Sequence, residues 1–175
     1  MVIETSSFEQ TQELGEKLSS YLDRGFVLGF KGELGTGKTT FIQGICRGLK
    51  VSELVVSPTF VLMNVYSGEI RGQKVPVYHF DLYRLTSKDF LDLGLEEYLG
   101  GNGISLLEWI DRAEGSFSFP HLEISISYGE TSDSRIFSFI PKGISAEWLT
   151  FYHLTLQLML GAWLFLKMVF FMQKN

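Results

Sequence analysis

The chain has 175 residues, with 15 basic side chains against 20 acidic ones and a formal net charge of −5. This length suits one globular domain with a sizeable core and excludes two independent enzymatic domains. The acidic balance argues against a protein that grips nucleic acid on a basic face, so we expect contact with RNA only through a partner. The single cysteine, Cys46, excludes an intrachain disulfide, and the absence of a signal-peptide pattern at the N-terminus favours the cytoplasm.

The first half of the chain predicts a helix, a buried strand, a glycine-rich loop and a second helix, in that order. Ser7, with Gln10 three residues later, forms a capping-box pattern ahead of leucines at helical spacing. Residues 26–30 form a short apolar run typical of a central strand, and residues 39–49 repeat apolar side chains at helical intervals. Two more strands are expected at 54–56 and 60–66, followed by a turn at 67–69.

The second half predicts strands at 75–80 and 104–107 with a helix at 88–99 between them. Residues 122–128 and 135–140 alternate apolar and polar side chains, which is typical of a hairpin with one solvated face. The pattern as a whole predicts an α/β fold whose sheet is mixed, parallel around the glycine-rich loop and antiparallel at the C-terminal strands, with helices flanking it. We expect this domain to span residues 1–143.

Residues 32–39 read GELGTGKT and match the phosphate-binding loop of nucleotide triphosphatases, G-x-x-x-x-G-K-[ST]. Glycines let backbone N–H groups turn toward phosphate oxygens, and the following helix points its positive dipole end at the same anion. The sequence therefore predicts a P-loop NTPase-like fold in which Lys38 reaches the phosphates and the Thr39 hydroxyl binds Mg²⁺. The nucleotide-binding residues expected from this loop are Gly35, Thr36, Gly37, Lys38, Thr39 and Thr40.

Two predicted strands end in a carboxylate that is suited to complete the metal site. The apolar run 104–107 leads into Glu108, as in a Walker-B strand, and residues 77–80 lead into Asp81. Ligands of α/β folds bind at the carboxyl ends of the strands, so both carboxylates are candidates, and the presence of the phosphate loop favours a functional role for Glu108. The alternative for either carboxylate is that it caps a strand or forms an ion pair with Arg84 or Arg112.

Four motifs together resemble the bacterial TsaE (YjeE) family. GELGTGKTTF at 32–41, SPTF at 57–60, HFDLYR at 79–84 and LLEWIDR at 106–112 occur in the order and approximate spacing of that family, and the resemblance covers roughly residues 5–142. Its members are small P-loop ATPases required for threonylcarbamoyladenosine (t6A) in tRNA, and they work with the TsaB and TsaD proteins. The resemblance implies a Mg²⁺-dependent ATPase that takes ATP and Mg²⁺, supports the t6A modification complex and meets tRNA only through its partners.

The resemblance also implies roles for individual residues. Lys38 would bind phosphates and assist catalysis, and Thr39 and Glu108 would share the Mg²⁺ and link it to the reaction. Asp81 resembles a catalytic or metal-linked carboxylate, and Thr59 resembles a switch residue that senses the γ-phosphate.

Three further residues have two interpretations each. Trp109 matches a family tryptophan beside the nucleotide, and its alternative is an aromatic side chain that fills space under the loop. Thr11 matches a family segment near the adenine, and its alternative is an ordinary threonine on a helix surface. His79 would share one face of an extended segment with Asp81, and its alternative is a buried, hydrogen-bonded histidine.

Residues 144–175 extend beyond the family pattern as an apolar tail that we expect to be helical. The stretch from Trp148 to Leu166 contains no Asp, Glu, Lys or Arg, and as a helix it would run about 28 Å, close to the hydrocarbon thickness of a bilayer. A narrow polar stripe in its first half instead favours a helix packed on protein or lying at an interface. Membrane association, self-association and an extension without a selected role all stay open.

Two other functions use the same loop. A small-molecule kinase would need an acceptor pocket and, usually, an arginine-rich lid, whereas the six arginines of this chain are scattered. A membrane-tethered scaffold that binds nucleotide without turnover would rely on the tail.

Overall fold

The computed structural model describes residues 2–113, 115 and 119–143, which form a seven-stranded sheet with helices on both faces. The elements in chain order are β1 (Val2–Thr5), α1 (Phe8–Ser19), β2 (Val27–Lys31), α2 (Lys38–Gly48), β3 (Met63–Ile70), β4 (Gln73–Asp81), α3 (Ser87–Asp92), the 3₁₀ turn η1 (Leu95–Tyr98), β5 (Ile104–Glu108), the 3₁₀ turn η2 (Ile110–Ala113), β6 (His121–Tyr128) and β7 (Arg135–Lys142).

The sheet is mixed, as the sequence predicts, with the order β1-β7-β6-β2-β5-β4-β3. Strand β2 pairs in parallel with β5 and β6, and β5 pairs in parallel with β4. The β6–β7, β7–β1 and β3–β4 pairs are antiparallel. The four central parallel strands therefore end at the same edge of the sheet, which is where α/β folds bind ligands.

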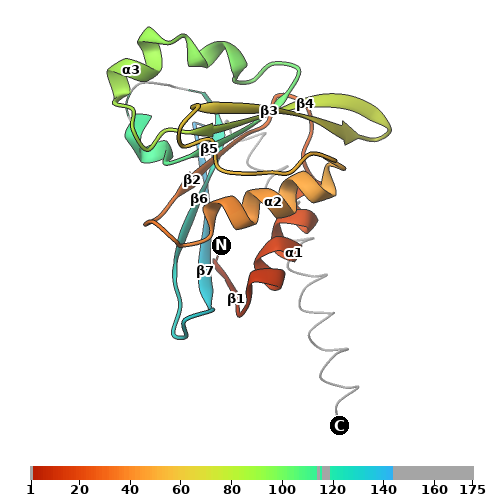
Figure 1. The fold of residues 1–175 in the computed structure, drawn as a ribbon, viewed down its shortest axis with the longest axis vertical. Coiled ribbons are helices and arrows are strands. Elements are labelled where there is room, and N and C mark those ends of the chain that lie inside the picture. The colour runs from red at the N-terminus through yellow and green to blue at the C-terminus, as the bar shows by residue number, and fades with distance from the viewer. Residues whose placement is uncertain (1, 114, 116–118, 144–175) are drawn as a thin grey trace. The chain divides into compact units, whose positions relative to one another are not determined.

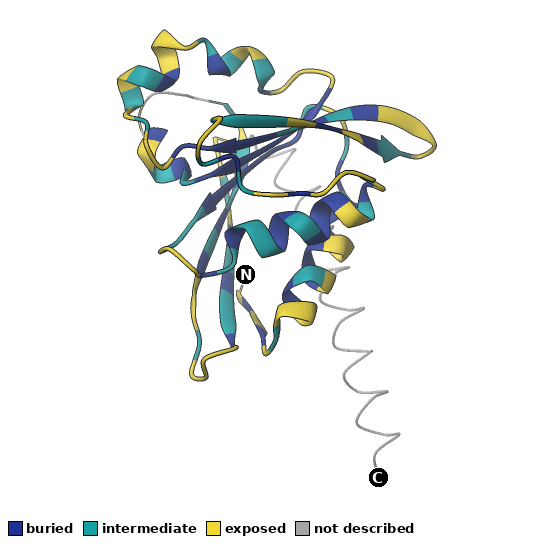
Figure 2. Ribbon diagram, in the orientation of Figure 1, coloured by how far each residue is buried: buried dark blue, intermediate teal, exposed yellow. Residues whose placement is uncertain are grey.

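Helices α1 and α2 lie side by side on one face of the sheet, and α3 lies on the other (Figure 1). The ring of Phe41 in α2 packs 6.0 Å from that of Phe30 in β2 and 5.0 Å from that of Phe137 in β7, measured between ring centres. On the opposite face, Phe90 and Leu95 join buried side chains of β4 and β5 in a second apolar cluster. Figure 2 shows the resulting buried band along the central strands.

The two helices on the first face touch through glycines. A β-carbon at Gly44 would lie 2.1 Å from the carbonyl oxygen of Gln12, and one at Gly15 would lie 2.3 Å from that of Phe41. Both distances are below any tolerable contact with backbone atoms, so α1 and α2 approach closely only because these positions lack side chains. This approach fixes the phosphate loop, which leads directly into α2, against the rest of the domain.

Several predicted boundaries were wrong. Residues 54–56 form no strand, and β3 begins at Met63 because the backbone of Leu62 turns into the left-handed region, with φ 72°. The hairpin turns at Arg71 and Gly72, whose φ values of 49° and 81° suit a two-residue type I′ turn, rather than at 67–69.

The helix predicted at 88–99 was also wrong as one element, since it divides into α3 and η1 at Gly94, whose φ is 64°. Strand β1, which the sequence analysis did not predict, pairs with β7 at an edge of the sheet.

The tail falls outside the described residues, so its predicted helix and its possible membrane association remain predictions. Within the part of the chain that is described, no helix is both long enough and apolar enough to cross a membrane.

Replacing Gly44 with alanine should lower the free energy of unfolding by about 1–3 kcal/mol, because the new methyl group meets the Gln12 carbonyl. In an exposed helix interior, the same change raises the free energy of unfolding by about 1 kcal/mol, so a decrease here would indicate the close helix contact. Urea denaturation followed by circular dichroism measures it, with Lys17→Ala on the exposed surface of α1 as the control. A Gly44→Ala protein as stable as the wild type would contradict the close helix contact.

Candidate functional site

The glycine-rich loop runs from the end of β2 into the first turn of α2. Gly32 has φ 147°, and a β-carbon there would lie 2.3 Å from the carbonyl oxygen of Ile126 in β6. Gly37, the N-cap residue directly before α2, has φ 96°. Both positions require glycine, so the motif glycines shape the loop as the sequence predicts.

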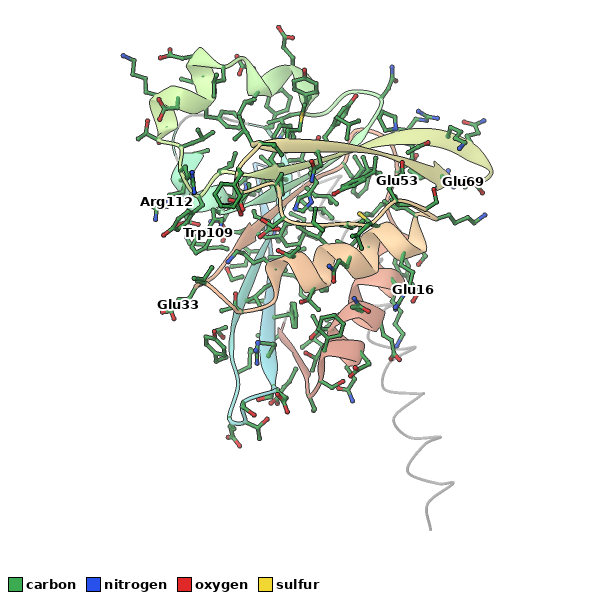
Figure 3. The ribbon with its side chains drawn as sticks, in the orientation of Figure 1. Glu16, Glu33, Glu53, Glu69, Trp109 and Arg112 are labelled. Atoms are coloured by element: carbon green, nitrogen blue, oxygen red, sulfur yellow. The ribbon has the colours of Figure 1, made fainter. Side chains whose placement is uncertain are left out.

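Lys38 lies across the mouth of this loop. Its Nζ donates to the carbonyl oxygens of Gly32, at 2.8 Å, and of Glu33, at 2.9 Å, and lies 3.7 Å from the centre of the Trp109 ring. An ammonium group has three hydrogens, so one is left to donate to a ligand in the loop. Figure 3 shows Glu33 and Trp109 at the same end of the molecule, with Arg112 near Trp109.

Two opposite influences act on the charge of Lys38. Burial lowers the pKa of the Lys38 ammonium, while the negative charges of Glu108, Asp81 and Asp111 act in the opposite direction. A buried cation at a concave backbone site attracts an anionic group, which would replace solvent as its counter-charge.

Glu108 lies at the end of β5, beside the start of α2. Its Oε1 accepts a hydrogen bond of 2.8 Å from the Thr39 hydroxyl and lies 2.9 Å from Nε2 of His79 in β4. His79 is fully buried, and among the described residues its Nδ1 has no partner. We therefore assign the ring hydrogen to Nε2, so that His79 donates to Glu108 and fixes the carboxylate together with Thr39.

Asp81 ends β4 directly beside Glu108, its register partner on β5. Its Oδ2 accepts hydrogen bonds from the hydroxyls of Ser57, at 2.7 Å, and Thr59, at 2.5 Å. Its Oδ1 accepts one from the backbone N–H of Tyr83, at 3.0 Å. In the described part of the chain neither Asp81 nor Glu108 pairs with an arginine, so the alternative of a structural ion pair is not observed.

A cavity of about 320 Å³ adjoins the outer side of the loop. Its lining includes Gly35, Gly37 and Thr40 of the loop region, Ser7, Phe8 and Thr11 near the start of α1, and Asp133 and Arg135 near the start of β7. Thr11 lines this cavity, but its hydroxyl is bonded to the Ser7 carbonyl and to the Thr5 hydroxyl.

The β6–β7 hairpin hydrogen-bonds to the outer side of the phosphate loop. Tyr128 donates its hydroxyl to the carbonyl of Leu34, at 2.9 Å, and Arg135 donates Nε to the carbonyl of Thr36, at 3.2 Å. The guanidinium of Arg135 lies 4.6 Å from the centre of the Tyr128 ring. These two donors fix the carbonyls of Leu34 and Thr36 on the side of the loop that faces the hairpin.

The predicted site residues thus fall into two adjoining groups. Lys38, Thr39, Asp81, Glu108 and Trp109, with Thr59 held through Asp81, lie at the carboxyl edge, whereas Thr11, Gly35, Gly37 and Thr40 line the cavity. The hydroxyl and the backbone N–H of Thr36 both donate to the Glu33 carbonyl, so both donors are engaged within the loop itself. Sequence reasoning missed Tyr128 and Arg135, because their contacts to the loop span 94 and 99 residues and leave no local pattern.

The hydroxyl of Thr39 and the carboxylate of Glu108 are hard oxygen donors, which suit Mg²⁺. Among the described residues no group of three or more His, Cys, Asp or Glu side chains is arranged to hold a metal alone. A Mg²⁺ ion here would therefore complete its coordination with water and phosphate oxygens, as it does at most nucleotide sites.

Comparisons with known proteins agree on one family. The family model described as Threonylcarbamoyl adenosine biosynthesis protein TsaE matches residues 5–137. The tRNA threonylcarbamoyladenosine biosynthesis protein TsaE of Nostoc sp. is 40% identical over 126 residues, which cover 70% of this chain and 75% of that protein. The protein of the same description from Bacillus subtilis is 35% identical over 141 residues, which cover 81% and 85%.

A solved structure is also similar. The crystal structure of YdiB from Bacillus subtilis superposes with a TM-score of 0.71 at 28% sequence identity, and the match covers 90% of this chain and 94% of that one.

Replacing His79 with leucine should raise the Mg²⁺ concentration needed for half-maximal binding of a fluorescent ATP analogue by about tenfold, because Glu108 loses the N–H that orients it. His79→Gln keeps an N–H donor and should shift the Mg²⁺ curve less. A Mg²⁺ titration on both variants, with melting curves to verify folding, makes the measurement. Identical curves for wild type and a folded His79→Leu protein would leave His79 as a packing residue only.

Proposed function

The chain belongs to the TsaE family of threonylcarbamoyladenosine biosynthesis proteins, and on that premise we propose that it is a Mg²⁺-dependent ATPase that drives a step of t6A modification of tRNA. The observation that carries this proposal is the convergence of Lys38, Thr39 and Glu108 at one phosphate loop, with Asp81 adjacent to Glu108. Cation, hydroxyl and carboxylates in this arrangement suit the transfer of a phosphoryl group to water.

The loop and Lys38 bind the phosphates. Backbone N–H groups and the remaining Nζ hydrogen of Lys38 donate to the β- and γ-phosphate oxygens. As the bond to the leaving phosphate breaks, negative charge develops on those oxygens, and a cation already held by the Gly32 and Glu33 carbonyls stabilises it without having to reorganise.

Thr39 and Glu108 hold the Mg²⁺ in this proposal. The ion neutralises phosphate charge and orients the oxygens when bound. His79 and Thr39 both bind Oε1 of Glu108 and so restrict the rotation of its carboxylate. That restriction preorganises the metal ligand before the nucleotide arrives.

Asp81 and Thr59 act on the water and the terminal phosphate. Asp81 is 5% exposed and is fixed at both oxygens by Ser57, Thr59 and the Tyr83 N–H, so its remaining acceptor capacity points in a defined direction. We assign it the role of orienting the attacking water, and we assign Thr59 the role of sensing the γ-phosphate.

The cavity beside the loop receives the adenosine part of ATP. Phe8 is 54% exposed at the start of α1 and offers a flat apolar surface to a base, and Arg135 provides a cation on the opposite element. Gly35, Gly37 and Thr40 line the same cavity, which makes it continuous with the phosphate-binding residues.

The partners in this proposal are the TsaB and TsaD proteins, and tRNA is reached through them, in keeping with the net charge of −5. Residues 1–143 form the ATPase domain. Residues 144–175 have no part in the chemistry, and membrane association, self-association and the absence of a selected role stay open for them.

Lys38→Ala should lower ATP turnover roughly 30- to 150-fold, which corresponds to about 2–3 kcal/mol for a lost charge-assisted contact to the phosphates. Purified protein is assayed with and without the TsaB and TsaD proteins, followed by analysis of modified nucleosides in tRNA. Lys17→Ala, an exposed lysine of α1, is the matched control and should behave as wild type. Unchanged kinetics in a folded Lys38→Ala protein would rule out hydrolysis at this loop.

Glu108→Gln and Asp81→Asn should separate metal binding from the hydrolytic step. We expect Glu108→Gln to raise the Mg²⁺ concentration required for turnover, and Asp81→Asn to reduce kcat at least tenfold while nucleotide binding is retained. A Mg²⁺ titration of turnover and a nucleotide-binding isotherm on each variant make the distinction. Wild-type curves for both variants would exclude both carboxylates from the reaction.

A further inference from the structure

A group of exposed aromatic, aliphatic and arginine side chains lies just outside the proposed ATP site, and we term it the aromatic–arginine patch. Phe60 is 86% exposed, Val61 67% and Tyr83 46%. The guanidinium of Arg84 lies 4.7 Å from the centre of the Phe60 ring, and that of Arg112 lies 5.6 Å from the centre of the Tyr83 ring. These contacts join the SPTF segment, the end of β4 and η2 into one surface.

The cations of this patch have no carboxylate partner among the residues that the structure describes. Arg84 and Arg112 are both exposed, and neither forms an ion pair with another residue of the described ranges. Arg47 and Lys50, by contrast, form ion pairs with Glu16 and Glu69. Two unpaired guanidinium groups beside apolar side chains therefore complement a surface that presents carboxylates next to apolar groups.

We propose that the aromatic–arginine patch is the docking surface for a protein partner whose complementary surface combines apolar side chains with carboxylates. This inference rests on the proposed function, in which the partner is the complex of TsaB and TsaD. Exposed aromatic and arginine side chains in contact are typical of the residues that dominate protein interfaces. Two cations, each beside an aromatic ring, are too few for an RNA surface, which needs many phosphate contacts to hold a strand.

The patch is connected to the proposed catalytic carboxylate on both sides. Ser57 and Thr59, which precede Phe60, donate to Oδ2 of Asp81, and the Tyr83 N–H donates to Oδ1. The backbone N–H of Asp81 donates to the carbonyl of Leu62, whose φ is 72°. One buried carboxylate therefore holds the two chain segments that carry Phe60, Val61, Tyr83 and Arg84.

A second connection runs through Trp109. The Tyr83 ring lies 4.9 Å from the ring of Trp109, which in turn lies 3.7 Å from Nζ of Lys38. A phosphate bound by Lys38 would change the net charge beside the Trp109 ring that contacts Tyr83. The docking affinity of the patch should therefore depend on the nucleotide state.

The test measures the affinity of the full chain for the purified TsaB–TsaD complex, by titration with a nonhydrolysable ATP analogue and Mg²⁺ present and again without nucleotide. We expect Phe60→Ser and Arg84→Glu each to weaken binding at least tenfold, while ATP turnover by the chain alone stays within twofold of wild type. Arg84→Glu should weaken binding more than Arg84→Ala, because it introduces repulsion with the partner's carboxylates.

The matched controls lie away from the patch. Val2→Ser changes an exposed apolar residue of β1, at the opposite edge of the sheet, and Lys17→Glu reverses an exposed charge on α1; both should bind as wild type. The wild type should bind with different affinity in the two nucleotide states, and equal affinities would overturn the coupling through Asp81 and Trp109.

The patch would be overturned as a protein-docking surface if Phe60→Ser and Arg84→Glu bound TsaB–TsaD with wild-type affinity. It would also be overturned if these variants lost binding to a tRNA anticodon stem-loop but kept their binding to TsaB–TsaD. Failure of the patch is distinguishable from failure of the proposed function. In the first case the wild type hydrolyses ATP, supports t6A formation and binds its partners through another surface, whereas in the second it does none of these.

Discussion

The arrangement of the site depends on two buried carboxylates placed side by side at the end of neighbouring parallel strands. Asp81 and Glu108 are register partners on β4 and β5, and both are almost fully buried. Two negative charges this close are tolerated only when nearby groups compensate them. Lys38 supplies the positive charge, while donors from Thr39, His79, Ser57, Thr59 and the Tyr83 backbone satisfy the oxygens. These side chains are thereby all engaged in compensating the same two carboxylates.

The conformation of the phosphate loop depends on a second constraint, which is that its backbone polar groups need hydrogen-bond partners. A loop that presents N–H groups to an anion must direct carbonyl groups outward, and buried carbonyls need donors. Lys38 serves the carbonyls of Gly32 and Glu33, and the β6–β7 hairpin serves those of Leu34 and Thr36. The loop is thus held in one conformation by contacts within the chain itself.

The features that sequence predicted well are those encoded by neighbouring residues. The strand, loop and helix around Lys38 are contiguous, and Asp81 and Glu108 each directly follow an apolar run whose end is positioned by the parallel sheet. The start of β3 could not be predicted in the same way. The apolar residues 60–62 resemble a strand, but Ser57 and Thr59 bind Asp81, more than twenty residues away, and that attachment keeps the segment irregular and Phe60 exposed. The role of Arg135 could not be predicted for the same reason, since the loop carbonyl that it binds belongs to Thr36, 99 residues away in the sequence.

Two of the four non-glycine residues with positive φ in the described part of the chain lie where these long-range attachments meet. Leu62 and Trp109 are bulky residues with φ values of 72° and 61°, a region that costs such residues of order 1–3 kcal/mol. Leu62 accepts the N–H of Asp81, and Trp109 follows Glu108 and contacts Lys38, so each strained residue is bonded to or next to one of the buried charges. The charges hold the strained segments in place, and the segments carry Phe60, Tyr83 and Trp109 to the surface around the loop. In the proposed function, the arrival or departure of a terminal phosphate changes the charge at the loop, and this change would act on the groups to which these two strained segments are bonded, next to the exposed aromatic–arginine patch.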